Sequence, residues 1–413
     1  MPISQVILLL LGLWQGYRLV QGFGRPSLPF RLMSLGYFVN YVLGASLSYH
    51  FNPWLPPLDV YAMQVDLGHY FKYVLPFMLI LVVFEFQISR LMDESNANDR
   101  EIQDHCRTLI FVGLLAGILQ RILPSSLTFY LYLASLISPV TYILFDNQKR
   151  SPFFFQRWFW IAFFWPLYGS FTTGMFYDLL LLIGLLVGKT AFSNTPSFFR
   201  SIVIVLLSTQ ITLFVQEAKH YLRRDQEITW EIGKNILHDS FQFDRNSMAM
   251  AALTVRLNQG YILSHVLKTG GEDFANQENG TYLAQLAASS VFPRFVLPNK
   301  LTSGDRHYFE KYSGLTLVGN TAMGLGLIAE STIDFGLGKG PFIFTLILLV
   351  IYQIVKAFRH RAFFPLYLLI AIFYFIRPDC DMITALGHFT KSTLVFGAIL
   401  FFHEHRKSGF RFR

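Results

Sequence analysis

Apolar runs of about 20 residues, with few or no charged side chains, recur along this chain from its first segment to its last. The first run, Ile3 to Val20, reads ISQVILLLLGLWQGYRLV. A helix of about 20 residues crosses the hydrocarbon core of a bilayer, where backbone polar groups must be paired within the chain. Hydrophobic residues make up 53% of the sequence and charged residues only 15%, far from the composition of soluble proteins. The sequence therefore predicts an all-α, multi-pass integral membrane protein.

The runs predict about 11 transmembrane helices, about eight of them before one long polar segment and about three after it. They cover residues 3–21, 30–49, 70–91, 108–123, 126–145, 155–169, 175–187, 201–217, 341–358, 363–376 and 389–402. The first run has no basic stretch before it and no small-residue cleavage site, so we expect a retained helix. The chain divides into an N-terminal transmembrane bundle (1–217), a large loop with a re-entry segment (218–340), C-terminal transmembrane helices (341–403) and a basic tail (404–413).

Lysine and arginine are distributed unevenly between the two alternating sets of connections. One set, which includes the tail HRKSGFRFR, carries most of them, whereas the other carries only Lys72, Arg121 and Arg377. Because cytoplasmic loops are enriched in these residues, we expect the C-terminus in the cytoplasm, the N-terminus outside and segment 218–340 as an extracytoplasmic helical lobe. Much of the net charge of +8 follows from this bias, so it does not indicate a nucleic-acid partner.

Within segment 218–340, residues 282–291 are predicted to form a helix that is broken at Pro293. The most basic stretch of the lobe is SSVFPRFVLPNKLTSGDRHYFEKY. Its prolines hold Arg294 and Lys300 on a stiff, non-helical path, and arginine offers a planar donor fork that suits phosphate oxygens. Arg294 lies between two phenylalanines, where a desolvated guanidinium needs an anion, so we predict that it binds a substrate anion. For Arg306 and Lys311, ion pairs with the neighbouring carboxylates Asp305 and Glu310 explain the charges equally well.

A second cationic candidate, Arg256, lies in TVRLNQGYILSHVL, where a polar helix turns apolar. Arg256 either faces the cavity in which Arg294 would bind the anion, or its long side chain reaches to the membrane interface. The tripeptide DCD at positions 379–381 resembles a metal-binding pair of aspartates, but no HExxH, HxH or Cys/His ligand spacing occurs. We expect no metal site and no cofactor. His388 and Lys391, at the start of the last expected helix, can face the same outer cavity.

A glycine-rich apolar stretch, GNTAMGLGLIAESTIDFGLGKG, contains two carboxylates, Glu330 and Asp334. Glycine permits close backbone approach, and irregular backbone near membrane depth is tolerated where it lines a cavity. A carboxylate there is costly unless it is used or paired. Glu330 is therefore interpreted either as a general base with a raised pKa or as the partner of an arginine in a salt bridge. If the segment is helical, Asp334 lies on the same face of the helix as Glu330, four residues earlier.

The segments RLNQGYILSHVL, SVFPRFVLPNK, FEKY and GLGLIAESTIDFG resemble the carboxyl-terminal half of the bacterial oligosaccharide repeat-unit polymerases, the O-antigen polymerase (Wzy-like) family. The resemblance covers residues 256–336 of the 413. The matching positions are Arg256, Pro293, Arg294, Pro298, Lys300, Glu330, Phe335 and Gly336. The chain departs from the family pattern at Asp334, where asparagine is expected, and at Asn299, where aspartate is frequent.

The resemblance implies a GT-C-like membrane glycosyltransferase. Such an enzyme polymerises polyprenyl-diphosphate-linked oligosaccharide repeat units into an O-antigen, capsule or exopolysaccharide on the outer face of the bacterial inner membrane, alongside a chain-length regulator and a flippase. The leaving lipid diphosphate gains negative charge in the transition state, which fixed cations stabilise. Together with the residue-level reading above, this predicts Arg294, Arg256 and Glu330 as catalytic residues and Lys300, Lys311, Arg306 and Asp334 as substrate-binding residues.

Two other readings stay open. A transporter or flippase of the same lipid-linked glycans would also use an outward cationic cavity, although no internal repeat is evident in the sequence. A glycan ligase would hand the chain to a different acceptor, and His238, His265 or His307 would then be candidates for its base.

Overall fold

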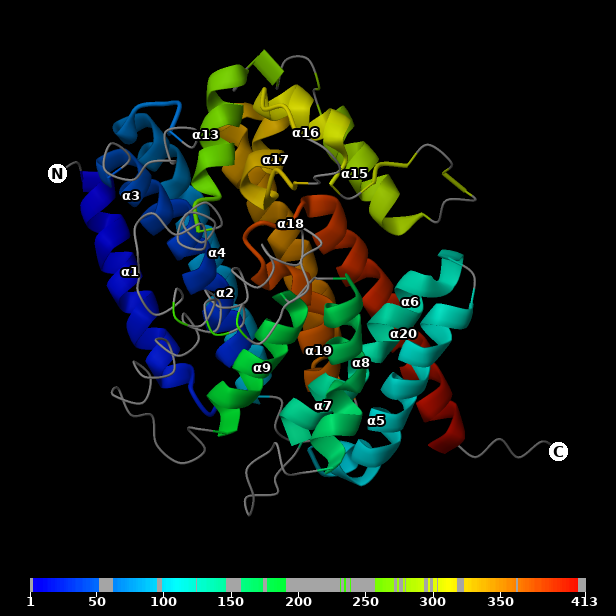
Figure 1. The fold of residues 1–413 in the computed structure, drawn as a ribbon. Coiled ribbons are helices and arrows are strands. Elements are labelled where there is room, and N and C mark those ends of the chain that lie inside the picture. Colours follow the sequence, from blue (N-terminus) through cyan, green and yellow to red (C-terminus); the bar gives the residue numbers. More distant parts are fainter. Residues whose placement is uncertain are drawn as a thin grey trace.

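The computed structural model describes most of the chain, and the following account concerns those residues only. They are residues 3–51, 62–94, 99–123, 125–145, 157–173, 177–190, 231, 234, 238, 257–270, 273–274, 278, 280–292, 296–297, 300–302, 304–317, 323–361 and 363–407. Their regular secondary structure is entirely helical, without a strand. Figure 1 shows a bundle of helices with a smaller group of helices at one end.

Five helical segments are long and apolar enough to cross a membrane, and the protein is a helical membrane protein. They are Ile3–Gly22, Leu67–Glu94, His105–Ile122, Gly338–Phe358 and Met382–Phe401, and shorter apolar helices span Thr128–Leu144, Asp178–Val187 and Phe364–Ile376. Large apolar side chains such as Leu13, Leu115 and Phe342 are exposed on the helix surfaces. An apolar exterior of this kind suits lipid, which needs no polar partner from the protein.

The helices of the bundle overlap the predicted runs, although the helices at Asp99–Ile122 and Met382–Lys407 begin well before the predicted starts at 108 and 389. They are α1 (Ile3–Gly22), α2 (Leu28–Phe38), α3 (Gly44–Phe51), α4 (Leu67–Glu94), α5 (Asp99–Ile122), α6 (Ser125–Ser135), α7 (Ile137–Phe145), α8 (Arg157–Thr173), α9 (Tyr177–Thr190), α18 (Gly336–Phe358), α19 (Phe364–Ile372) and α20 (Met382–Lys407). The expected helix at 201–217 lies outside the described residues.

Two predicted helices differ in form from the expectation. The run at 30–49 is α2 and α3 joined by a π-helical turn, Val39–Leu43. At Gly44, where α3 begins, a Cβ would collide with the carbonyl of Leu257, so the backbones approach too closely for any other residue. The run at 126–145 is divided into α6 and α7. Periodicity alone does not show such local breaks, because they depend on what packs against the helix.

The helices at one end form a group that we name the lobe. It consists of α13 (Gly260–Thr269), α15 (Thr281–Val291), α16 (Arg306–Ser313) and α17 (Leu327–Ile333). α15 matches the helix predicted at 282–291 and packs along α20, while α17 leads directly into α18. The lobe is therefore joined to the bundle through α15 and α17, at the junction visible in the upper part of Figure 1.

Two basic residues near the first connection, Arg18 and Arg31, lie partly inside the bundle. Arg18 of α1 forms an ion pair of 2.9 Å with Glu85 of α4, which is almost fully buried. Arg31 of α2 donates a hydrogen bond of 2.7 Å to the carbonyl of Arg18 and lies 3.9 Å from Asp93. Buried charges persist only when they are paired, so these contacts hold α1, α2 and α4 together.

Candidate functional site

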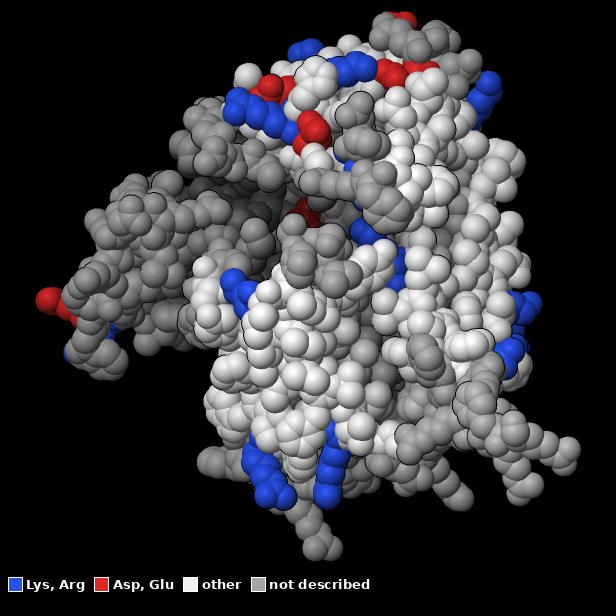
Figure 2. Space-filling model, turned by 90° about the vertical axis from the view of Figure 1, so that its right-hand side faces the viewer, with Lys and Arg blue, Asp and Glu red and all other residues white. Residues whose placement is uncertain are grey.

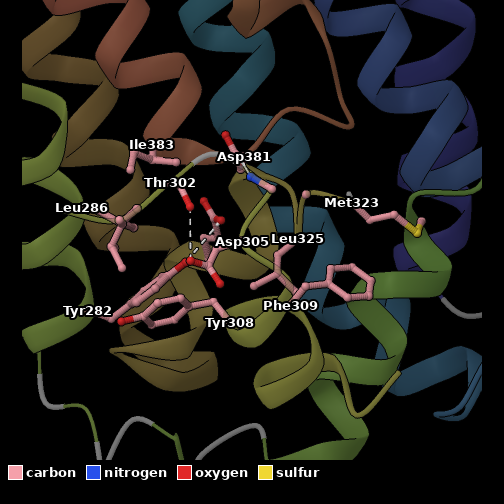
Figure 3. Close-up of a pocket in the computed structure, with 14 residues that line it drawn as sticks. Tyr282, Leu286, Thr302, Asp305, Tyr308, Phe309, Met323, Leu325, Asp381 and Ile383 are labelled. Carbon is pink, nitrogen blue, oxygen red and sulfur yellow. Dashed lines mark hydrogen bonds between the residues drawn. The ribbon is translucent and has the colours of Figure 1, made fainter. Parts of the chain in front are cut away.

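A pocket lies where the lobe meets the start of α20. It encloses about 310 Å³, including space open to solvent, and its lining combines aromatic residues with the carboxylates of Asp305, Glu330 and Asp381. Figure 3 shows Tyr282 and Tyr308 together at one end of this pocket, with Phe309 and Met323 at the other.

Glu330 is placed at the pocket by the first turn of α17. This helix begins after Gly326, whose φ of 87° lies in the left-handed region that favours glycine. A Cβ at Gly326 would lie 2.5 Å from the hydroxyl of Tyr41, so this position admits only glycine without rearrangement. The N–H of Glu330 then donates to the Gly326 carbonyl at 3.0 Å, which closes the first helical turn.

The carboxylate of Glu330 is only 4% exposed. Its Oε1 accepts a hydrogen bond of 3.3 Å from the hydroxyl of Tyr282, and its Oε2 accepts one from the N–H of Met382 at the start of α20. Burial, reinforced by the negative charge of Asp381, raises the pKa of Glu330 well above its usual range. A carboxyl group with a raised pKa beside a cavity is suited to exchanging a proton with a ligand near neutral pH.

Asp381 joins the lobe to α20. Its Oδ1 accepts a hydrogen bond of 2.9 Å from the N–H of Thr384, as a helix-capping aspartate does, and its Oδ2 accepts one of 2.8 Å from the N–H of Gly304. The two oxygens thus hold the loop after α15 against the beginning of α20. The sequence marked this residue only as part of a weak metal motif, whereas the structure shows that it is a cap and part of the pocket wall.

The predicted catalytic residues have different outcomes. Glu330 lines the pocket. Of its two interpretations, the salt bridge has no counterpart among the described residues, where its partners are Tyr282 and the backbone of Met382. Arg294 and Arg256 lie outside the described residues, and their roles stay predictions.

Two of the predicted substrate-binding residues hold the ends of α15. Asp334, which follows α17, accepts hydrogen bonds from the N–H groups of Tyr282, at 3.1 Å, and of Leu283 in the first turn of α15. Lys300 donates to the carbonyls of Ser289, at 2.9 Å, and of Phe292, at 3.4 Å, at the other end of α15. Neither residue lines the pocket, so what the structure shows for both is the anchoring of the helix that carries Tyr282.

The other two predicted binding residues, Arg306 and Lys311, form ion pairs on the lobe. Nε of Arg306 lies 2.7 Å from Glu310 Oε1, which is the ion-pair alternative considered for it. Nζ of Lys311 lies 2.5 Å from Glu278 Oε1, a partner from outside the basic stretch. Exposed pairs of this kind contribute little to stability, and neither cation lines the pocket.

Tyr282, Tyr308 and Asp381 are pocket residues that the sequence did not single out as site residues. The rings of Tyr282 and Tyr308 lie 5.7 Å apart between centroids. The only sequence signal for Tyr282 was its position at the start of a predicted helix. The three histidines considered for a ligase base, His238, His265 and His307, do not line the pocket. Among the described residues, no group of three His, Cys, Asp or Glu side chains could hold a metal ion.

Comparisons of the chain with protein-family models, with curated proteins and with solved structures give no match.

Proposed function

We propose that this protein is a membrane glycosyltransferase that polymerises polyprenyl-diphosphate-linked oligosaccharide repeat units into a surface polysaccharide. The observation that carries the proposal is the buried carboxylate of Glu330 in the wall of a pocket between a polar lobe and a membrane bundle. A lipid-linked glycan has its lipid in the bilayer and its sugars in water, so an enzyme acting on it needs a site at such a junction.

The side chains that line the pocket suit a sugar by their chemistry. Aromatic rings such as Tyr282 and Tyr308 offer apolar faces with polar tips, and the carboxylates of Glu330 and Asp381 offer acceptors for hydroxyl groups. The terminal sugar of the acceptor repeat unit would lie against the tyrosines, with its attacking hydroxyl toward Glu330. This arrangement agrees with the sequence resemblance, which independently assigns Glu330 to catalysis.

In the proposed reaction, the acceptor hydroxyl oxygen attacks the anomeric carbon of the donor glycan. The bond from that carbon to the donor's diphosphate breaks, and the electron pair leaves with the lipid diphosphate. Glu330 takes the hydroxyl proton as a general base, a role for which a raised pKa is favourable. The charge that develops on the diphosphate requires fixed cations, for which Arg294 and Arg256 are the candidates from the sequence. The donor arrives activated, so the reaction as proposed needs no cofactor.

The same proposal includes the finer architecture and location. We infer about 11 transmembrane helices in a GT-C-like arrangement in the bacterial inner membrane, with the lobe outside and the C-terminus in the cytoplasm. The charge bias of the connections supports this orientation. A chain-length regulator and a flippase are the partners that such a polymerase would need.

The decisive experiment is deletion of the gene in its host, followed by electrophoresis of the surface polysaccharide. We expect the ladder of chain lengths to collapse to a single repeat unit, restoration by the wild-type gene, and no restoration by Glu330→Gln expressed at the same level. Purified protein should lengthen lipid-linked repeats without other proteins. Loss of all surface glycan, with no lengthening by the purified protein, would indicate a transporter. Long chains retained on the lipid carrier would indicate a ligase.

A further inference from the structure

An unusual lysine lies inside the last membrane helix. Lys391 belongs to α20, within the apolar segment Met382–Phe401, and its Nζ lies 4.1 Å from the ring centroid of Phe129. Among the residues that the structure describes, no carboxylate contacts Lys391 or neutralises its charge. An ionisable side chain in a membrane span is costly and is usually retained for a function.

A second lysine approaches the first from the lobe. The ammonium of Lys300 is held at the end of α15 by the carbonyls of Ser289 and Phe292. Ser290, in the same turn of α15, faces Gly387 of α20, one turn before Lys391. Two like charges in partly apolar surroundings repel each other strongly. An anion that contacts both would remove this repulsion.

The packing of α15 against α20 leaves room for the lysine amine. α20 carries Gly387 one turn before Lys391, and a Cβ at that position would lie 3.9 Å from Nζ of Lys391 and 3.9 Å from Cα of Ser290 in α15. The Lys391 amine therefore folds back over a glycine toward α15. Figure 2, which views this side of the molecule, shows a hollow between the lobe and the bundle with both acidic and basic side chains in and beside it.

Exposed apolar side chains lie at the end of α15, where Lys300 is bound, and after Lys391 in α20. Val291 and Phe292 at the end of α15 and Leu394, three residues after Lys391, are each about half exposed, at 50%, 47% and 57%. A free anion gains nothing from such neighbours, whereas an amphiphile with an anionic head and a hydrocarbon chain uses both features. The surroundings of the two lysines thus favour a lipid over an inorganic ion.

The same two helices lead from the lysines to the pocket. α15 contributes Tyr282 and Leu286 to the pocket, and α20 contributes Ile383. Gly387, beside the Lys391 amine, follows Ile383 by one helical turn, which is about 6 Å along the axis. An anionic group held at the lysines would therefore lie next to the pocket.

We propose that Lys391 and Lys300 form a binding site for the phosphate group of a lipid that enters from the membrane between α15 and α20. The lipid chain stays in the bilayer beside Val291, Phe292 and Leu394. The identification of this lipid with the glycan donor rests on the proposed function, whereas the binding itself does not.

The test measures binding of farnesyl phosphate to the purified full-length protein in nanodiscs, with inorganic phosphate and farnesol as comparison ligands. Lys391→Met keeps the length of the side chain and removes its charge, and we expect at least tenfold weaker binding, since hydrogen bonds to charged groups are the stronger ones. The matched control is Lys356→Met, because Lys356 also lies in a membrane helix over a ring, 5.9 Å from that of Tyr352. We expect the control to bind like the wild type.

Chemical footprinting of lysines in the wild-type protein tests the site even if a variant fails to fold. Farnesyl phosphate should protect Lys391 and Lys300 from reductive methylation and leave Lys356 unprotected. Equal affinity in Lys391→Met and wild type, or absence of protection, overturns the site. Displacement by equimolar inorganic phosphate, or equal binding of farnesol, overturns its assignment to a lipid phosphate. No glycan is involved, so binding without chain growth would reject the polymerase and retain the site, and normal chain growth with an unprotected Lys391 would do the reverse.

Discussion

Oε1 of Glu330 accepts a hydrogen bond of 3.3 Å from the hydroxyl of Tyr282, a residue 48 positions away in the sequence. The backbone N–H of the same tyrosine donates to Asp334, which directly follows the helix of Glu330. α15 and α17 are thus fastened to each other twice, once through each carboxylate. The positions of Glu330, the candidate base, and of Tyr282 in the aromatic wall are therefore coupled. A substitution that displaces one of them should also displace the other.

Burial of Glu330 should make its replacement stabilising at neutral pH. Because its pKa is raised in the folded protein, the folded state retains a proton that the unfolded chain releases, and the free energy of unfolding falls as the pH rises through that pKa. Glu330→Gln has no ionisable group at this position, so it avoids this loss of unfolding free energy at higher pH. We expect its melting temperature to exceed that of the wild type at pH 8 and the difference to shrink toward pH 4. A difference that grew on acidification would contradict the assignment. Glu310→Gln, at an exposed ion pair, is the control.

Gly326 should tolerate no side chain. Alanine there would place a Cβ against the Tyr41 hydroxyl and adopt a positive φ, and strained backbone conformations cost about 1–3 kcal/mol. We expect Gly326→Ala to lower both stability and chain growth, because the turn that positions Glu330 must shift. Gly184→Ala is the matched control, since nothing lies within 4 Å of a Cβ at that helical glycine. Thermal unfolding and ladder length measure the two effects, and equal behaviour of the two variants would reject the prediction.

Asp334 should act through the structure of α15. Asp334→Ala leaves the N–H groups of Tyr282 and Leu283 without their acceptor, and loss of a helix cap costs about 0.5–2 kcal/mol. Asp334→Asn keeps an acceptor oxygen, so we expect a smaller loss of stability and retained polymer length. If the asparagine variant kept full stability but lost chain growth, the carboxylate would be needed by the substrate, which is the binding role predicted for Asp334 from the sequence.

Arg294 and Arg306 should differ sharply although both belong to the same basic stretch. Arg306 is 49% exposed and paired with Glu310, where screening leaves less than about 1 kcal/mol, so Arg306→Ala should retain long chains. For Arg294, the sequence predicts a fixed, desolvated donor, and removal of such a donor costs about a hundredfold to a thousandfold in rate. Arg294→Lys should restore little, because the donor fork is lost. A full ladder from well-expressed Arg294→Ala would reject the predicted role.

Cysteine labelling of intact cells tests the proposed orientation. After replacement of Cys106 and Cys380, the two cysteines of the chain, a cysteine at His307 on the lobe should react with an impermeant reagent. A cysteine at His360, in the basic connection between α18 and α19, should react only in permeabilised cells, because the positive charges favour the cytoplasm. The reverse labelling pattern would place the lobe in the cytoplasm and contradict the proposed reaction on the outer face of the membrane.

The membrane class and most helices could be predicted from the sequence because they follow from local properties. The length of an apolar run and the lack of charge in it determine a span, as for Ile3–Gly22 and Leu67–Glu94. Thr281–Val291 was also predictable, from its composition and the proline that follows. Glu330 could be identified as a candidate site residue from the sequence, because a carboxylate in an apolar stretch is costly unless it is paired or used.

The tertiary structure decided which residues surround each functional group. Asp381 and Gly304 are 77 positions apart, yet they are hydrogen-bonded at the pocket. Lys391 and Lys300 both lie at the end of α15 only because α15 packs on α20. Asp334 and Lys300 looked like ligand-binding charges, and the structure shows them at the two ends of α15. Composition and periodicity describe what a segment requires from its surroundings. Which distant segment satisfies that requirement depends on how the helices pack, since burial and hydrogen bonding are settled only when the whole chain has closed around them.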